Sequence, residues 1–346
     1  MQKYMNKCLE LARKGLGKTS PNPLVGCVVL NKDGEIISTG YHAEYGKNHA
    51  ERDALLKLNI GDAEGGTLFV NLEPCSHYGK TPPCTDLIIE HKIKTVVIGM
   101  RDPNPKVDGV SILRNAGIDV IEGVMEDECR KLNEVFLTNQ LEKRTFVAIK
   151  TATTLDGKVA TSNGSSKWIT SEMARNEVKF IREKYDAILT TSATVNSDNP
   201  TMLHRKKVIL DRNLITDLSS KIYQQGEIFI FHSKEKVTNG CKNSNIKYIF
   251  SPMSEGLLDL EFMLKKLYEL GIMSVLVESG GRLNGKMLEY TDKIYNFIAP
   301  KIVGDNRAKS SFDFREVFDI NDADVFNLTD VMKFPPDVLL ILHRQN

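Results

Sequence analysis

Short apolar, β-branched runs alternate with amphipathic helical patterns along almost the whole chain. A sequence in which strand-like and helix-like segments take turns predicts a layered α/β fold with a largely buried sheet. At 346 residues the chain is longer than one ordinary domain of roughly 100 to 200 residues, so we expect two domains.

The first half opens with an amphipathic helix over 3–14 and ends in a polar hinge at Leu141–Thr145, which sets the expected domains at 1–145 and 146–346. Its expected strands are Leu24–Leu30, Ile36–Gly40, Thr67–Leu72, Thr95–Gly99 and Asp119–Glu122. Its further helices are His49–Leu58, Thr85–His91, Val110–Ala116 and Glu126–Gln140. In the second half we expect helices at Glu172–Tyr185, with Thr170 and Ser171 as candidate caps, and at Leu258–Leu270. The strands expected there are Phe146–Thr151, Asp186–Leu189, Val208–Leu210, Glu227–Phe231, Ile246–Phe250, Ser274–Val277, Lys293–Ile298 and Asp337–Leu342.

Charge and hydropathy exclude several kinds of partner. Lys and Arg total 46 against 45 Asp and Glu, and residues 1–145 carry 19 basic and 20 acidic side chains, so neither half offers the basic surface that polymeric nucleic acid requires. The apolar runs are far shorter than the roughly 20 residues of a membrane-spanning helix. The N-terminus lacks a signal-peptide core, and Glu10 favours an ordinary helix over a transit peptide. We therefore expect a cytoplasmic protein without nucleic-acid or membrane partners, and we further expect it to be a homo-oligomer.

The most specific motif is His49-Ala50-Glu51, which is followed by Pro74-Cys75 and then by Cys84. One imidazole and two thiolates suit zinc, and three protein ligands leave the fourth tetrahedral position open for water, as in a catalytic site. Zinc lowers the pKa of such a water, and a neighbouring carboxylate can move a proton to a leaving amine. The order H-x-E, P-C, C is that of the zinc deaminases, in which Glu51 is the acid and base and His49, Cys75 and Cys84 are the ligands.

Chance is the alternative explanation for this motif. A single H-x-E triplet is usually a surface feature, and Ser76–Pro83 separates the cysteines by more than the usual C-x-x-C spacing. The combination favours a metal site, because the triplet opens an expected helix and Cys75 follows an expected strand. The other cysteines stand in apolar or amphipathic contexts and are interpreted as small hydrophobic residues: Cys8, Cys27, Cys129 and Cys241.

Three further segments extend the pattern: Pro21–Gly26, Glu73–Cys84 and Asp102–Lys106. With His49–Glu51 they closely resemble the deaminase domain of the bifunctional riboflavin biosynthesis proteins, a family with this long cysteine spacing. The resemblance implies a cytidine-deaminase-like α/β/α domain that acts on a pyrimidine ribose phosphate. Groups for the ring and the phosphate would come from loops around the pocket, although each residue taken alone could be merely packed or solvated. These residues are Asn22, His42, His77, Lys80, Thr81 and Asn104.

The second half has no G-x-G-x-x-G after its first strand, so the Rossmann fingerprint is absent. Instead, Val277–Gly285 leads from an apolar strand through Gly280-Gly281 into an expected helix, where backbone N–H groups could face a pyrophosphate or the glycines could form only a tight turn. This segment, Thr154–Lys158, Ser166–Thr170 and Ala193–Pro200 resemble the family's reductase domain, which implies a dihydrofolate-reductase-like α/β fold and NADPH. The implied cofactor positions are Ala152, Trp168, Thr194, Asp198, Gly280, Gly281, Arg282 and Lys286. The implied substrate positions are Ser166, Arg182, Met202, Arg205 and Glu278.

Some features of this half have more than one interpretation. Trp168 could be an aromatic residue of the core instead of a cofactor position. The stretch Thr190–Val195 lacks the glycines common in the family, and the segment after Arg205 is shortened. Lys150 and Asp198 are candidate proton donors, with structural ion pairing as the alternative.

The resemblance implies two consecutive steps of riboflavin biosynthesis. The first is zinc-dependent hydrolytic deamination of 2,5-diamino-6-(ribosylamino)-4-pyrimidinone 5′-phosphate. The second is NADPH-dependent reduction of the ribosyl side chain, which gives 5-amino-6-(5-phosphoribitylamino)uracil. A deaminase of tRNA or free nucleosides would share the zinc chemistry but would leave the second half unexplained. A non-catalytic protein with a structural zinc would leave Glu51 and the open fourth position unexplained.

Overall fold

The computed structural model describes residues 1–78, 82–235, 244–313 and 316–345. The chain divides into two compact units, Met1–Lys143 (unit 1) and Arg144–Asn346 (unit 2), close to the boundary expected at residue 145. Each unit contains a sheet flanked by helices, so the expected α/β class is confirmed. Within the described ranges, no helix combines the length and the apolar character needed to cross a membrane.

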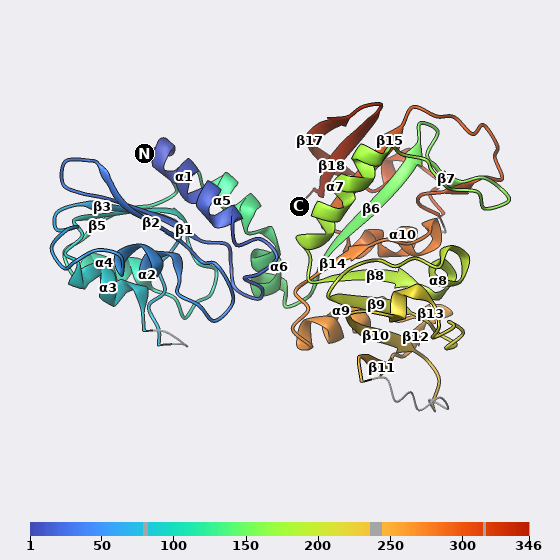
Figure 1. Ribbon diagram of the computed structural model, residues 1–346, viewed down its shortest axis with the longest axis horizontal. Coiled ribbons are helices and arrows are strands. Elements are labelled where there is room, and N and C mark those ends of the chain that lie inside the picture. The colour runs from blue at the N-terminus through green and yellow to red at the C-terminus, as the bar shows by residue number, and fades with distance from the viewer. Residues whose placement is uncertain (79–81, 236–243, 314–315, 346) are drawn as a thin grey trace. The chain divides into compact units, whose positions relative to one another are not determined.

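Unit 1 is a five-stranded sheet between two layers of helices (Figure 1). The strand order is β2-β1-β3-β4-β5, with β1 antiparallel to both neighbours and β3, β4 and β5 parallel. The strands are β1 (Gly26–Leu30), β2 (Ile36–Tyr41), β3 (Thr67–Leu72), β4 (Thr95–Met100) and β5 (Asp119–Ile121). The helices are α1 (Gln2–Arg13), α2 (Ala50–Leu55), α3 (Cys84–Glu90), α4 (Gly109–Asn115), α5 (Glu126–Leu132) and α6 (Glu134–Glu142). Helices α1 and α5 cover one face of the sheet, and α2, α3 and α4 cover the other.

The core of unit 1 lies on both faces of this sheet. Strand β1 is buried along its whole length, because helices cover it from both sides. The apolar face of α1 is buried, as its periodicity predicts, and Cys8 lies within it. Cys27 and Cys129 also belong to this core, which confirms their interpretation as small hydrophobic residues. Cys241 lies outside the described residues.

The single helix expected over Glu126–Gln140 is wrong, because α5 ends before Asn133 and α6 begins after it. The buried Asn133 side chain is bound to the backbone of Leu24 instead: Leu24 N donates to its Oδ1 at 2.8 Å, and its Nδ2 donates to Leu24 O at 3.0 Å. Asn71 donates to the same carbonyl at 2.9 Å and accepts from Gly26 N at 2.8 Å. The side chains of Asn133, where the helix is interrupted, and of Asn71 therefore hold the loop that enters β1.

Unit 2 is built on a nine-stranded sheet of order β11-β10-β9-β8-β14-β6-β15-β18-β17. Its strands run parallel from β11 to β15, and β18 and β17 follow antiparallel at one edge. The strands of this sheet are β6 (Phe146–Thr154), β8 (Ala187–Thr191), β9 (Lys206–Leu210), β10 (Glu227–His232), β11 (Ile246–Phe250), β14 (Ser274–Val277), β15 (Lys293–Ala299), β17 (Phe326–Phe334) and β18 (Asp337–Arg344). Two short pairs join β7 (Lys158–Ala160) to β16 (Lys309–Ser310) and β12 (Met253–Ser254) to β13 (Leu257–Leu258). The helices are α7 (Glu172–Glu183), α8 (Ser192–Asp198), α9 (Leu260–Glu269) and α10 (Gly281–Met287), with 3-10 turns at Lys221–Tyr223, Leu288–Tyr290 and Ile320–Asp322.

Some elements of unit 2 follow from the sequence and others do not. Ser171 caps α7, since its side chain accepts a hydrogen bond from Ala174 N at 3.3 Å, as its position before Glu172 predicts. Strand β17 was not expected, because most of its residues are exposed and its apolar residues do not alternate. Helix α8 was not expected either, because Val195 is its one buried residue.

Candidate active sites

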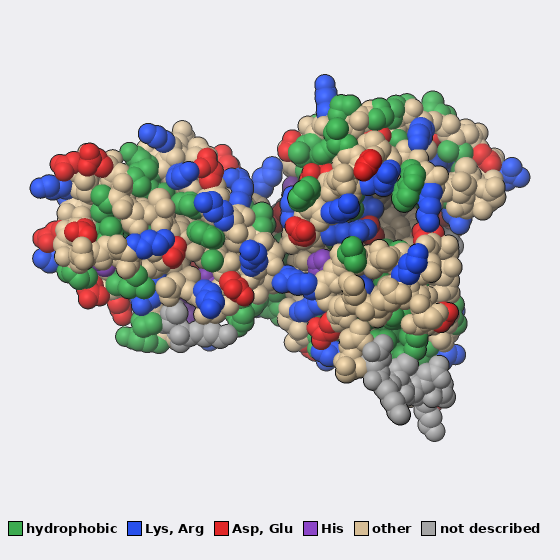
Figure 2. Space-filling model, in the orientation of Figure 1, with side chains coloured by type: hydrophobic (Ala, Val, Ile, Leu, Met, Phe, Trp, Pro, Cys, Tyr) green, Lys and Arg blue, Asp and Glu red, His purple; other side chains and the backbone are tan. Residues whose placement is uncertain are grey.

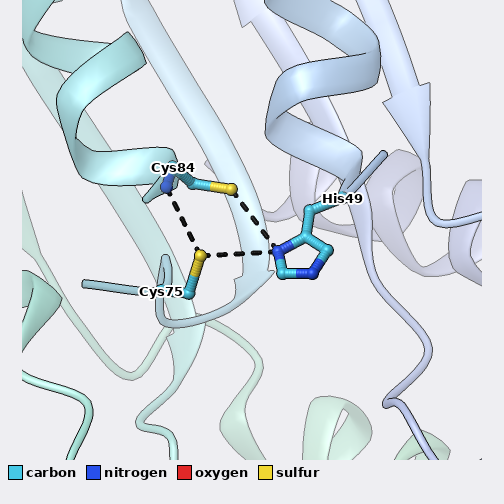
Figure 3. A group of neighbouring side chains, drawn as sticks. All are labelled: His49, Cys75 and Cys84. Carbon is cyan, nitrogen blue, oxygen red and sulfur yellow. Dashed lines mark hydrogen bonds between the residues drawn. The ribbon is translucent and has the colours of Figure 1, made fainter. Parts of the chain in front are cut away.

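Three ligand side chains meet in unit 1 (Figure 3). His49 immediately precedes α2, Cys75 follows β3, and Cys84 is the first residue of α3. Nδ1 of His49 lies 3.4 Å from Sγ of Cys75 and 3.6 Å from Sγ of Cys84. The three donor atoms all lie within 4.8 Å of one another, so the fold brings the expected ligands to one point.

These spacings fit a zinc ion. A Zn–S distance of about 2.3 Å and a Zn–N distance of about 2.0 Å, at a tetrahedral angle, place the nitrogen about 3.5 Å from each sulfur. The backbone N–H of Cys84 donates to Sγ of Cys75 at 3.3 Å. Hydrogen bonds from the Cys84 thiol and from His49 lower the pKa of Cys75 to about 4. The Cys75 sulfur is therefore a thiolate at neutral pH, which is the form that binds zinc.

Glu51 lies in the first turn of α2, next to the cluster. The residue is 3% exposed. Burial, together with the charge of Cys75, raises the pKa of Glu51 to about 7. A carboxyl group with a pKa near neutrality can both accept and release a proton, which general acid–base catalysis requires.

Close backbone contacts position the elements that carry the ligands. A Cβ on Gly40, in β2, would lie 2.2 Å from the carbonyl oxygen of Ala50, so α2 approaches β2 at a distance that only glycine permits. A Cβ on Gly109, at the start of α4, would lie 2.2 Å from the carbonyl oxygen of Pro74. His49 and Cys75 are thus placed by contacts made at the residues beside them.

The cluster opens into a cavity of about 310 Å³ that lies within unit 1 and is lined also by Glu51. Its size suits a small molecule. The expected substrate residues that line it are Asn22, His42, His77 and Asn104, whereas Lys80 and Thr81 lie outside the described residues.

His42 and Asn22 form a hydrogen-bonded pair on the cavity wall. Nδ1 of His42 lies 2.9 Å from the carbonyl oxygen of Asn48, and its Nε2 lies 3.1 Å from Nδ2 of Asn22. Burial lowers the pKa of His42, so the ring is neutral at pH 7. A neutral ring that donates to Asn48 accepts from Asn22, which fixes the orientation of the Asn22 amide.

Sequence reasoning missed other residues of this cavity: Tyr45, Lys47, Glu73, Asp102 and Gln140. Glu73 is buried, and its carboxylate accepts from the backbone N–H of Asp102 at 3.2 Å and of Val110 at 3.0 Å. It therefore ties the end of β3 to the segment after β4 and to α4. Glu73 and Asp102 stand inside the motifs that carried the family resemblance, which is the signal that could have found them. The other three stand in no motif.

Unit 2 contains a larger cavity of about 1660 Å³, lined by residues of β6 and by the segments that follow β8 and β14. Ligands of open α/β sheets bind outside the carboxyl ends of the strands, which is where these segments lie. Figure 2 shows a hollow on this unit with Lys and Arg side chains gathered around it. The expected residues that line the cavity are Ala152, Ser166, Trp168, Arg182, Thr194, Asp198, Met202, Glu278, Gly280, Gly281 and Arg282.

Two of the expected residues, Arg205 and Lys286, do not line this cavity. Arg205 directly precedes β9, which is parallel to β8, so its backbone lies at the amino ends of these strands. Its carbonyl oxygen accepts from Glu227 N at 2.8 Å. Lys286, near the end of α10, is paired with Glu255 at 3.1 Å.

Glu278 follows β14 and is buried between two cations. Its carboxylate lies 2.9 Å from Nζ of Lys150 and accepts from Nε and Nη2 of Arg182 at 2.6 and 3.0 Å. Burial opposes ionisation of this group, but Lys150 and Arg182 outweigh burial and lower the pKa of Glu278 to about 2. The cluster therefore carries a net positive charge on the cavity wall, which suits a phosphorylated ligand.

Trp168 is 62% exposed, so the core aromatic residue considered as its alternative is excluded. Its ring lines the cavity, and the Arg175 guanidinium carbon lies 4.3 Å from the ring centroid. This cation–π contact holds a flat aromatic surface on the cavity wall. Such a surface can stack against the planar rings of a nucleotide cofactor.

Glycines at the start of α10 and within it differ in their surroundings: two are packed closely against another segment, and one faces open space. A Cβ on Gly281 would lie 2.3 Å from the carbonyl oxygen of Ser310, and one on Gly285 would lie 1.8 Å from that of Asp313. These glycines permit close approach of the 310–313 segment. At Gly280 no heavy atom lies within 4 Å of an added Cβ, and this residue lines the cavity.

Comparison with known families gives the class of each unit. Residues 1–100 match the cytidine and deoxycytidylate deaminase zinc-binding region, and residues 145–340 match the RibD C-terminal domain. The chain therefore joins a zinc-binding deaminase domain to a RibD reductase domain.

Known proteins are similar in sequence to this chain over nearly its full length. The riboflavin biosynthesis protein RibD of Aquifex aeolicus is 41% identical over 329 residues and 91% of each chain, and that of Actinobacillus pleuropneumoniae is 39% identical over 97% of this chain and 93% of its own. The crystal structure of a diaminohydroxyphosphoribosylaminopyrimidine deaminase/5-amino-6-(5-phosphoribosylamino)uracil reductase from Thermotoga maritima superposes with a TM-score of 0.90 at 40% identity and covers 99% of this chain and 98% of that one. The chain belongs to the RibD family, the bifunctional deaminases and reductases of riboflavin biosynthesis.

Proposed function

We propose that unit 1 deaminates 2,5-diamino-6-(ribosylamino)-4-pyrimidinone 5′-phosphate by hydrolysis and that unit 2 then reduces the ribosyl side chain to give 5-amino-6-(5-phosphoribitylamino)uracil. The observation that carries this proposal is the ligand cluster with buried Glu51 beside it in a cavity of substrate size. The cation-lined cavity of unit 2 supports the second step.

In the deaminase site, His49, Cys75 and Cys84 would hold one zinc ion, which supplies the Lewis acidity that makes water nucleophilic near neutral pH. Glu51 accepts a proton from the water that adds to the ring carbon bearing the 2-amino group. It then delivers this proton to the departing ammonia, so one water is consumed and one ammonia released. A pKa of about 7 suits Glu51 to both transfers.

Polar groups on the cavity wall would bind the rest of the substrate. Because Asn22 donates from Nδ2 towards His42, its Oδ1 can accept from an amino group or N–H of the ring. His77 and Asn104 would bind the ring and the ribose from the loops after β3 and β4. Lys80 and Thr81 are proposed for the phosphate.

In the reductase site, bound NADPH supplies the hydride for C1′ of the ring-opened ribosyl group. Lys150 is the proposed proton donor, because its side chain is 16% exposed in the cavity wall and its ammonium is held by Glu278 at 2.9 Å. Asp198 is exposed, and its carboxylate accepts a hydrogen bond from the Ser197 hydroxyl. These features fit a role in cofactor binding better than a role as proton donor. The proposed cofactor residues are Ala152, Trp168, Thr194, Asp198, Gly280, Gly281 and Arg282. The proposed substrate residues are Ser166, Arg182, Met202 and Glu278.

The test is incubation of purified protein with the diaminopyrimidine substrate and NADPH, with and without a metal chelator. We expect ammonia release and NADPH oxidation without chelator. With chelator, ammonia release should stop while supplied deaminated intermediate is still reduced. Undiminished ammonia release in zinc-free protein would contradict the deaminase assignment, and a failure to oxidise NADPH with the intermediate would contradict the reductase assignment.

We also infer that the enzyme works in the cytoplasm as a homo-oligomer and needs neither nucleic acid nor a membrane. Its near-neutral charge, with 46 basic and 45 acidic residues, supports a small-molecule substrate over a polyanion. Cell fractionation and light scattering of the purified protein test these two inferences. Recovery in the membrane fraction, or a monomer at all concentrations, would contradict them.

A further inference from the structure

Few of the described residues in the wall of the unit 1 cavity can attract an anion. Glu51, Glu73 and Asp102 bring carboxyl groups to its wall. One zinc ion would only balance the charge of the two cysteine thiolates. Among the lining residues that the structure describes, Lys47 is the one lysine or arginine.

The loop that carries Lys47 is held by hydrogen bonds on both sides. Lys47 N donates to Glu44 O at 3.0 Å, and Tyr45 N donates to Lys18 O at 3.1 Å. The carbonyl oxygen of Asn48 is bound by Nδ1 of His42 at 2.9 Å. The backbone of Lys47 is therefore fixed with respect to the cavity.

The side chain of Lys47 is available to a ligand. It is exposed, and its ammonium makes no hydrogen bond or ion pair with any residue in the described part of the chain. Lys47 stands two residues before His49, so its Cα lies within about 7 Å of the Cα of that ligand. A four-carbon stem then lets the ammonium reach groups that are displaced from the metal centre by the width of a sugar.

We propose that Lys47 binds the 5′-phosphate of the deaminase substrate and makes the site selective for the phosphorylated pyrimidine over its dephosphorylated form. The proposal rests on the deaminase function proposed above. The pyrimidine ring must reach the metal centre, and the phosphate lies one ribose away from the ring. An ammonium at the cavity wall offsets the charge of the phosphate and offers it three hydrogen-bond donors.

The test compares kcat and KM for deamination of the phosphorylated substrate and of its dephosphorylated nucleoside. The variants are Lys47→Met, Lys47→Glu and, as control, Lys18→Met. Lys18 is an exposed lysine in the neighbouring loop that does not line the cavity. In Lys47→Met we expect KM for the phosphorylated substrate to rise about 10- to 100-fold, with kcat nearly unchanged. The rise should be larger in Lys47→Glu, and KM for the nucleoside should stay at the wild-type value in Lys47→Met.

Other readouts separate binding from folding. Inorganic phosphate should inhibit the wild type competitively and Lys47→Met more weakly, and Lys18→Met should match the wild type throughout. Reduction of supplied deaminated intermediate should be unchanged in every variant, which shows that unit 2 is folded, and the unchanged KM for the nucleoside in Lys47→Met shows that unit 1 is folded.

An unchanged KM for the phosphorylated substrate in Lys47→Met would overturn the proposal. An equal rise of KM for both substrates would also overturn it, because Lys47 would then act on the ring or on the fold. If the wild type releases ammonia from neither substrate, the proposed deaminase function itself fails, and the role of Lys47 fails with it.

Discussion

Replacing Glu278 by Gln removes the negative charge that balances Lys150 and Arg182 in the wall of the reductase cavity. The three side chains are 7%, 16% and 22% exposed, and their contacts range from 2.6 to 3.0 Å. Breaking a buried ion pair by removing one partner costs about 3–5 kcal/mol, because the other charge stays buried without compensation. We expect the free energy of unfolding of unit 2 to fall by this amount. For a domain of this size the Tm should drop by about 6–20 °C.

The assay is differential scanning calorimetry, which separates the transitions of the two units if they unfold independently. Glu255→Gln is the matched control: Glu255 pairs with Lys286 at 3.1 Å but is 78% exposed, so the free energy of unfolding should change by less than about 1 kcal/mol. The double variant Glu278→Gln/Lys150→Met should recover part of the loss. A wild-type Tm in Glu278→Gln would refute the reasoning.

The same carboxyl group gives a pH dependence. The pKa of Glu278 is about 2 in the folded chain, below its ordinary value of 4.5. Its stabilising contribution is therefore fully present above about pH 4.5 and is lost as the pH falls towards 2. In Glu278→Gln the free energy of unfolding should lack this part of its decrease at low pH. Urea unfolding at a series of pH values would measure the difference.

Other variants test the remaining assignments. Glu51→Gln should keep its zinc but lose deamination about 10²- to 10⁴-fold, measured as ammonia release beside metal analysis, and near-full turnover would refute an acid–base role. Because the pKa of Glu51 is raised to about 7, its own contribution to the stability of zinc-free unit 1 is lost as the pH rises from about 5 to 7, so Glu51→Gln should gain stability relative to the wild type over this range in urea unfolding. Cys75→Ser should lower the zinc content while reduction of supplied intermediate persists; a full complement of zinc would exclude it as a ligand. Trp168→Ala should raise KM for NADPH without lowering the Tm, since the ring is exposed, and a large drop in Tm would instead indicate packing. Gly109→Ala should destabilise unit 1 by about 1–3 kcal/mol in urea unfolding, because its Cβ would lie 2.2 Å from the Pro74 carbonyl oxygen; wild-type stability would contradict the close contact.

The cluster of His49, Cys75 and Cys84 could be predicted because the information that specifies it is local. Each ligand stands at the end of an element that periodicity identifies, and the ends of β3, α2 and α3 meet at one side of the sheet. The chemistry of His49, Cys75 and Cys84 then limits the ion that they can bind. Family resemblance added Asn22, His42, His77 and Asn104, which line the same cavity.

The features that the sequence leaves open depend on non-local geometry. Arg205 has suitable chemistry for a phosphate and stays a prediction, because the position of its backbone at the amino ends of the strands follows only from the direction of β9. Lys47 has no motif around it, and its role depends on the loop being held against His42 and Lys18. The interruption at Asn133 could not be predicted from helical periodicity, because its cause is a backbone contact with Leu24. The sequence context of Trp168 fits both a core residue and a residue of a cavity wall, and only its exposure in the structure excludes the core position.

The bond between Asn133 and Leu24 joins positions 109 residues apart and has a consequence for the order in which the deaminase site is completed. During synthesis the three metal ligands are all present once residue 84 has been added, but the loop carrying Asn22 is tied down only after Asn133 follows. A chain that stops between these points would hold its metal ligands without the anchor of the Asn22 loop. The metal-ligand motif is thus complete in the chain before the residue that anchors the loop leading into β1, so we expect a truncated unit 1 to need Asn133 to hold that loop.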